Sequence, residues 1–186
     1  DPAGASSQYG IYDFASEKNH FCVNNTVYWE DSANWSSGFY YQGRIESDSV
    51  VFANNMIVDA SATVNTTNNK WIIGPEIRGN VKPSIVNNNV YSTNSNNIGG
   101  GATVPNQMRL INVNTGYLFD AQWTDFGYDT DGMETDPDLT DPANGDVTPQ
   151  NIAFANIGLP GYTTEDIDGD SRTACGPDPG AKEFFV

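Results

Sequence analysis

Three of the chain's eight basic residues lie close together, at Lys70, Arg78 and Lys82. A lysine or arginine can act as a general base, and a neighbouring cation can neutralise the carboxylate of an acidic substrate. The spacing of these residues matches no motif that is specific for one reaction. These three residues therefore suggest a catalytic site but do not identify the reaction.

An acidic tract between positions 125 and 141 suggests a second kind of chemistry. Carboxylates on loops hold calcium, which accepts about six to eight oxygen ligands in flexible geometry. The segments DTDG (129–132) and DIDGD (166–170) resemble calcium loops, although neither has the full pattern with its terminal Glu. The candidate ligands are Asp129, Asp131, Asp166, Asp168 and Asp170. The alternative is a solvated acidic loop with Asx-turns.

Aromatic side chains form a third candidate group, at Trp29, Trp35 and Tyr40. Sugar rings stack on exposed aromatic faces, so these residues are candidates for carbohydrate contact. Side chains alternate along a strand, so at least one of residues 39–41 should face outward. The competing interpretation is that these rings stack on one another between neighbouring strands.

Charge and composition exclude several classes of function. The formal net charge is −16, which disfavours nucleic acid or an anionic membrane surface as a partner because phosphate binding needs Lys and Arg clusters. No apolar stretch reaches the roughly 18 residues of a membrane span. With His20 as the only histidine, a zinc site is not expected. Cys22 and Cys175 either form a disulfide, as in an oxidising compartment, or remain two buried thiols.

A repeated pattern of short strands would position these residues. The related segments are FCVNNTVY (21–28), VFANNMIV (51–58) and SIVNNNVY (84–91), which place Asn24, Asn54 and Asn87 in equivalent positions. The apolar segments that accompany them are YGIYDF (9–14), GFYYQG (38–43), KWIIGP (70–75) and GYLFDA (116–121). A repeat at intervals of about 30 residues is typical of stacked structural units. We therefore expect an all-β chain, a parallel β-helix solenoid of about three to four coils.

The repeat also predicts which side chains stack. One aliphatic column is Val23, Ala53 and Val86, and a second is Val27, Ile57 and Val90. Between them, Asn25, Asn55 and Asn88 are expected to form a ladder of hydrogen-bonded amides. Asn tolerates the left-handed backbone region better than other non-glycine residues, which suits the corner of a coil. The asparagines are therefore predicted to be structural.

The C-terminal part of the chain resembles a known family. The segments DPANGD (141–146), DIDGDSR (166–172) and GPDPGAKE (176–183) are similar to the C-terminal end of secreted bacterial right-handed parallel β-helix proteins of the pectate-lyase-like class. Ser171, Pro179 and Lys182 depart from that family's pattern. The resemblance implies right-handed coils over residues 1–125, a cap over residues 126–186 and an extracellular or cell-surface setting.

Two functions fit this resemblance. The first is a non-catalytic structural or assembly module, with carbohydrate as a candidate ligand and with upstream coils or a neighbouring subunit covering the open N-terminal end of the stack. The second is the C-terminal part of a polysaccharide lyase that acts on an acidic glycan. In lyases of this class a Lys or Arg is the base, and this implies the catalytic role for Lys70, Arg78 and Lys82.

Overall fold

The computed structural model describes residues 7–13, 20–30, 35–43, 50–60, 70–77, 85–92, 108–110, 115–117, 130, 132–133 and 135–183. Within these ranges the protein is all-β. The regular helices found there are two short 3-10 turns, η5 (Pro142–Asn144) and η6 (Ile152–Phe154). Across the same ranges, no helix has the length and apolar character needed to cross a membrane.

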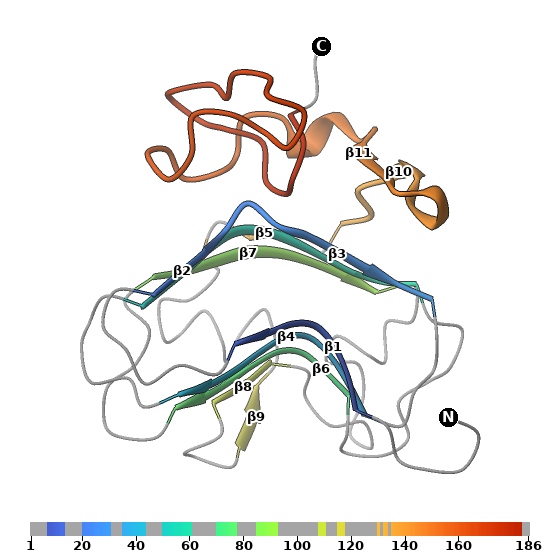
Figure 1. The fold of residues 1–186 in the computed structure, drawn as a ribbon, viewed down its shortest axis with the longest axis vertical. Coiled ribbons are helices and arrows are strands. Elements are labelled where there is room, and N and C mark those ends of the chain that lie inside the picture. The colour runs from blue at the N-terminus through green and yellow to red at the C-terminus, as the bar shows by residue number, and fades with distance from the viewer. Residues whose placement is uncertain are drawn as a thin grey trace.

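Successive strands are placed in two sheets in turn. The first sheet contains β1 (Ser7–Asp13), β4 (Trp35–Gly43), β6 (Lys70–Ile77) and β8 (Met108–Leu110), paired in parallel in that order, and the antiparallel strand β9 (Thr115–Tyr117). The second sheet contains β2 (His20–Val23) and β3 (Thr26–Trp29), both paired in parallel with β5 (Val50–Asp59), and then β7 (Ile85–Ser92). The two sheets face each other as layers (Figure 1).

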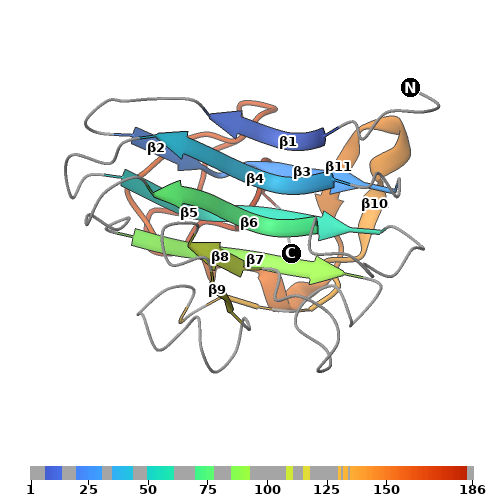
Figure 2. The ribbon, with the colours of Figure 1, turned by 90° about the horizontal axis from the view of Figure 1, so that it is seen from below.

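The strands follow the apolar segments of the repeat. Val, Ile, Phe and Tyr favour a pleated, half-buried surface, and the breaks between strands fall where Asn, Ser and Gly accumulate. We call β1, β2 and β3 together the first rung, because they lie at one border of the two sheets (Figure 2). Strands β7 and β8 lie toward the opposite border, with β9 beyond them.

The register agrees with the predicted stacking in most positions. Val23 pairs with Ala53, Val27 pairs with Ile57, and Ile57 pairs with Val90. The prediction that Val86 stacks on Ala53, and with it the equivalence of Asn54 and Asn87, is wrong. Val86 pairs with Phe52, and Asn87 pairs with Ala53.

The cause is a register shift in the middle of the pair between β5 and β7. Ala53 pairs with Asn87 and Met56 pairs with Asn89, so two residues of β5 lie opposite one residue of β7. A bulge of this kind inserts one extra residue into one of the two strands and bends it locally. The Asn-rich sequence of β7 can be aligned in either of two ways, one residue apart, and pairing with β5 selects one of them.

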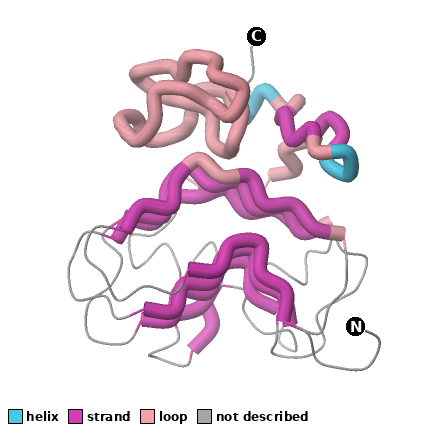
Figure 3. The backbone as a smooth tube through the Cα atoms, in the orientation of Figure 1, coloured by secondary structure: helices cyan, strands magenta, loops and turns pink. Residues whose placement is uncertain are grey.

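A third layer, which we call the cap (residues 135–183), lies on the outer face of the second sheet (Figure 1). It consists mainly of loops (Figure 3), with one antiparallel pair formed by β10 (Leu139–Asp141) and β11 (Asp146–Pro149). Its apolar anchor is Phe154, which is fully buried in a cluster with Met56 and Val58 of β5. The predicted boundary between coils and cap, at residue 125, lies outside the described residues.

Candidate functional site

In the two Asn pairs whose side chains the structure describes, at 24–25 and 54–55, the two residues point in different directions. Asn24 and Asn54 have positive φ angles of 54° and 56°, in the left-handed region that Asn tolerates better than most residues. In the first rung this kink of the backbone separates strand β2 from strand β3. Asn24 and Asn54 then face the cap, and Asn25 and Asn55 face the interior between the sheets.

Asn54 fixes the cap to the sheet. Its Nδ2 donates to the carbonyl of Leu159 at 2.8 Å, and its Oδ1 accepts from the Leu159 backbone N–H at 2.7 Å. Its own carbonyl accepts from the N–H of Gly180 at 2.6 Å. Asn54 is 1% exposed, so these bonds replace water that cannot reach it. In the first rung, Asn24 donates from Nδ2 to the hydroxyl of Thr163.

The inward asparagines make one step of the predicted ladder. Asn25 Nδ2 donates to Asn55 Oδ1 at 2.9 Å, and the backbone N–H of Asn25 donates to the same oxygen at 3.1 Å. Asn55 in turn donates to the carbonyl of Cys22 at 3.0 Å. The side chain of Asn88 lies outside the described residues, so its place in the ladder stays a prediction. The asparagines with described side chains are occupied by structural bonds, which leaves little capacity for chemistry.

Cys22 lies beside this ladder and is not joined to Cys175. Its Sγ lies 3.4 Å from Asn25 Nδ2, which donates to it, whereas Cys175 is exposed on the cap. The structure therefore shows two separate cysteine thiols rather than a disulfide. They are not two buried thiols either, because Cys22 is half-buried and Cys175 is exposed.

Arg172 is the centre of the cap. Its Nη1 donates to Glu183 Oε1 at 2.9 Å and to the carbonyl of Asp178 at 2.8 Å, and its Nη2 donates to the carbonyl of Gly180 at 2.8 Å. The Nε donates to the carbonyl of Glu165 at 3.2 Å. Burial raises the pKa of the Glu183 carboxyl despite the neighbouring guanidinium. Every nitrogen of Arg172 is thus used to hold the cap together.

The predicted calcium loop at 166–170 is a turn instead. Asp166 Oδ1 accepts the backbone N–H groups of Asp168 and Asp170, both at 2.9 Å, and Oδ2 accepts that of Glu183 at 2.9 Å. The carboxylate of Asp168 contacts Lys182 Nζ at 3.0 Å. Both oxygens of Asp166 are directed at N–H donors rather than at a common centre.

The described geometry therefore gives no support to calcium ligands at Asp166, Asp168 and Asp170, and this assignment stays a prediction. Nowhere in the described ranges do three or more His, Cys, Asp or Glu side chains gather in a way that could hold a metal ion. The donors present at this turn do not fit calcium, because N–H groups and an ammonium group occupy the positions that the ion would need. Asp129 and Asp131 lie outside the described residues.

The predicted catalytic group cannot be assembled from the described residues. Lys70 is the first residue of β6 in the first sheet, where its backbone pairs with Ser36 of β4. Arg78 and Lys82 lie outside the described residues, as does the side chain of Lys70. The lyase alternative therefore stays a prediction.

The aromatic candidates do not share one strand or one sheet. Trp29 ends β3 in the second sheet, whereas Trp35 and Tyr40 belong to β4 in the first sheet. Trp29 is half-buried, and its indole Nε1 is buried with no hydrogen-bond acceptor among the described residues. The side chains of Trp35 and Tyr40 lie outside the described set, so their contact with carbohydrate also stays a prediction.

The side chains of β2 and β3 in the first rung are more exposed than the side chains of β5 with which they are in register. Phe21 is 59% exposed, whereas its register partner Val51 is 5% exposed. Val27 is 8% exposed against 1% for its partner Ile57. Asn25 is half-buried against 3% for Asn55, and no described residue donates to Asn25 Oδ1. Nothing among the described residues pairs with the outer edges of β1, β2 and β3.

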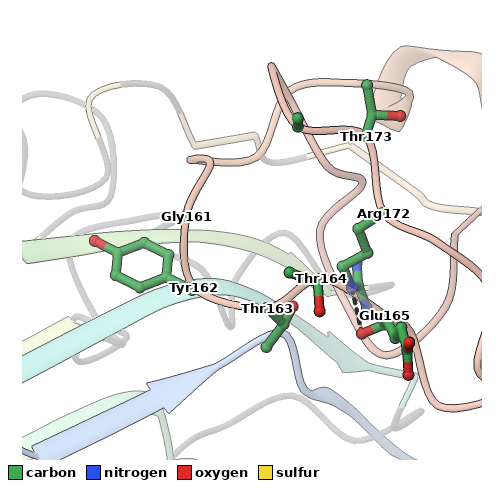
Figure 4. A pocket seen from close by; sticks show the side chains of 8 residues that line it. Gly161, Tyr162, Thr163, Thr164, Glu165, Arg172 and Thr173 are labelled. Carbon is green, nitrogen blue, oxygen red and sulfur yellow. Dashed lines mark hydrogen bonds between the residues drawn. The ribbon is translucent and has the colours of Figure 1, made fainter.

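The sequence analysis missed a hollow in the cap. It has a volume of about 510 Å³ and is lined by side chains that include Tyr162, Thr163, Thr164, Glu165, Arg172 and Thr173 (Figure 4). Two chain segments form it, one on each side of an antiparallel bridge between Glu165 and Ser171. No motif marks these residues in the sequence, and the only available signal was two adjacent threonines next to an aromatic residue.

Comparisons of the chain with protein-family profiles, with curated proteins and with solved structures find no match. The resemblance of the C-terminal segments to pectate-lyase-like proteins is not tested by these comparisons. The case for a function therefore rests on the geometry of the first rung and of the cap.

Proposed function

We propose that this chain is the C-terminal segment of a right-handed parallel β-helix that acts as a non-catalytic structural module in an extracellular or cell-surface protein. The support for coils is the alternation of the chain between two parallel sheets and the amide bond between Asn25 and Asn55. The support for the handedness and the location is the resemblance of the segments at 141–146, 166–172 and 176–183. The observation that carries the proposal is the first rung, whose outer edges pair with no described residue.

An open edge of a parallel sheet is a costly surface to leave uncovered. It offers a row of unpaired N–H and C=O groups, which natural proteins shorten, charge, bend or cover. Here β2 and β3 together are as long as the part of β5 with which they pair, and Phe21 is exposed beside them. Neither β2 nor β3 contains Lys or Pro, which are common devices for blunting an edge.

The amide of Asn25 indicates what kind of strand would cover this edge. Its Nδ2 is directed at Asn55, so the Oδ1 at the other end of the planar amide faces away from β5. A preceding rung with an Asn at the same position could donate both its N–H and its Nδ2 to this oxygen. Asn25 donates to Asn55 in this same way. The first rung is therefore suited to a further coil of the same type.

A coil from the same polypeptide fits this edge better than a second copy of the chain. A copy related by twofold symmetry would set the two Asn25 Oδ1 acceptors against each other. A copy stacked end to end would present the antiparallel strand β9, rather than a parallel edge, to β1. In either arrangement two molecules with a net charge of −16 would repel each other.

The mass of the protein isolated from its natural source tests this proposal. We expect a denatured mass well above the 20.2 kDa of this chain, with the sequence of this chain at the C-terminal end. A chain of 20.2 kDa in a larger assembly would instead identify a neighbouring subunit as the cover of the first rung. A monomer of 20.2 kDa would contradict the proposal.

A further inference from the structure

The hollow in the cap is a built surface rather than an accidental gap. The backbone N–H of Arg172 donates to the carbonyl of Thr164 at 2.9 Å, which joins its two walls. The side chain of Thr163 is held from behind by Asn24 of the second sheet. The hollow is therefore fixed both within the cap and against the sheet below. Figure 4 shows the residues that line it.

The charge of the hollow excludes anions as ligands. Arg172 is the cation nearest to it, but its guanidinium nitrogens donate to Glu183 and to three backbone carbonyls. Glu165 contributes an exposed carboxylate to the lining. In a chain with a net charge of −16, this leaves neutral or cationic ligands.

The lining is rich in groups that both donate and accept hydrogen bonds. Thr163, Thr164 and Thr173 supply three hydroxyls, and a hydroxyl has one donor and two acceptor positions. Thr163 Oγ1 accepts from Asn24, so its own proton remains available to a ligand.

Tyr162 adds an aromatic ring at one side of the hollow (Figure 4). Burial raises the pKa of its hydroxyl, so the group stays protonated and neutral at physiological pH. A flat apolar ring next to several hydroxyls matches a ligand with both C–H faces and hydroxyl groups. A simple cation would use the carboxylate and the ring but would leave the threonine hydroxyls without partners.

We propose that this hollow binds a neutral saccharide unit, with Thr163, Thr164 and Thr173 exchanging hydrogen bonds with the sugar hydroxyls and Tyr162 contacting its C–H face. The residues that would contact the saccharide all belong to the cap, so the proposal does not depend on the structural role proposed above for the first rung. If the saccharide proposal failed, the proposed structural role would still stand, and the reverse also holds.

Saturation-transfer NMR with glucose, galactose, mannose, xylose and N-acetylglucosamine tests this inference, with galacturonate and tetramethylammonium as anionic and cationic probes. We expect transfer to at least one neutral sugar and none to galacturonate. Removal of a hydroxyl in Thr164→Val or Thr173→Val should weaken binding of that sugar by about fivefold each. Ser171→Ala, which removes an exposed hydroxyl beside the hollow, is the matched control and should bind as the parent does.

A second variant separates the neutral sugar from a cation. Glu165→Gln keeps a side chain that can hydrogen-bond but removes the charge, so it should retain the sugar within about twofold. Circular dichroism and melting temperature would establish that each variant is folded. Absence of transfer to all five sugars would overturn the proposal, as would equal binding by the threonine variants. Binding of tetramethylammonium alone, lost in Glu165→Gln, would identify a cation site instead.

Discussion

At the scale of single residues, the two asparagines of a pair have opposite tasks. Asn54 faces the cap and binds both polar backbone groups of Leu159, and Asn55 faces the interior and accepts from Asn25. The left-handed conformation of Asn54 makes this reversal possible within one strand. Neither position could be filled by an aliphatic residue without leaving a buried polar group unpaired.

Asn54→Ala should therefore destabilise the protein by about 2 to 4 kcal/mol. The variant leaves the N–H and carbonyl of Leu159 without partners, and it replaces Asn by a residue that tolerates the left-handed region less well. Urea unfolding monitored by circular dichroism would measure the change. Asn156→Ala is the matched control, since Asn156 also has a positive φ, 62°, but is exposed. Equal losses in the two variants would mean that the bonds to Leu159 contribute nothing.

The carboxylate of Asp166 gives the cap a dependence on pH. Burial alone would raise the pKa of this group, but the backbone N–H groups of Glu183, Asp170 and Asp168 outweigh that effect and hold the pKa below its usual 3.8. A carboxyl with a depressed folded-state pKa stabilises the fold above the unfolded-state pKa. That stabilisation is lost as the pH falls through the folded-state pKa.

Asp166→Asn should consequently lower the free energy of unfolding most at neutral pH. The difference in unfolding free energy between parent and variant should narrow as the pH falls below about 3.8, because the unfolded parent chain then binds a proton that the folded parent does not bind until lower pH. Urea titrations from neutral pH down to about pH 2 would measure this difference in the free energy of unfolding. Asp168→Asn, whose carboxylate pairs with Lys182 at the surface, should change stability little at any pH. A gap that is independent of pH would count against the ionised turn.

At the scale of elements, the cap approaches β5 so closely that only glycine fits at one contact. A β-carbon on Gly180 would lie 2.6 Å from Thr26 Oγ1 and 3.3 Å from Met56 Cβ. Gly180 also has a φ of +93° and donates its N–H to the carbonyl of Asn54. The segment around Gly180 is thus pressed against the sheet and cannot move away without losing that bond.

Gly180→Ala should loosen the cap as a unit. Gly161→Ala is its matched control, because Gly161 has the same φ of +93° and nothing within 4 Å of its β-carbon position. The control should lose about 1 to 2 kcal/mol from backbone strain alone, and Gly180→Ala should lose about 1 to 3 kcal/mol more from the overlap. Hydrogen exchange should show the extra loss over residues 135–183. Equal behaviour of the two variants would mean that the contact relaxes freely.

Features that neighbouring residues specify could be predicted from the sequence, whereas features that depend on contacts between distant residues could not. The short runs of Val, Ile, Tyr and Phe locate the strands, because β-branched and aromatic side chains suit a pleated surface locally. The register between β5 and β7 was mispredicted at Ala53 because an Asn-rich strand permits two alignments. Asn54 and Leu159, which are in contact, lie 105 residues apart in the sequence, and no local sequence pattern indicates that they meet. The hollow depends on the same long-range docking.

At the scale of the whole molecule, the net charge opposes association between molecules, whereas the open edge of the first rung promotes it. A net charge of −16 keeps separate molecules apart at low ionic strength. Salt shortens the range of this repulsion to about 10 Å at 0.1 M and about 3 Å at 1 M. The unpaired edges of the first rung are then free to associate with other strands, as exposed sheet edges do.

The isolated chain should therefore aggregate as salt is added, and Phe21→Lys should suppress this. A lysine at the edge adds a charge that must be desolvated before another strand can pair there. Ile152→Lys is the matched control, because Ile152 is also 59% exposed but lies in the cap, away from the first rung. Static light scattering against sodium chloride concentration would measure both variants, and both change the net charge equally. Suppression by Phe21→Lys alone would locate the association at the first rung, the surface that we expect an upstream coil to cover. Equal suppression by both variants would reduce the effect to net charge and would remove this support for an upstream coil.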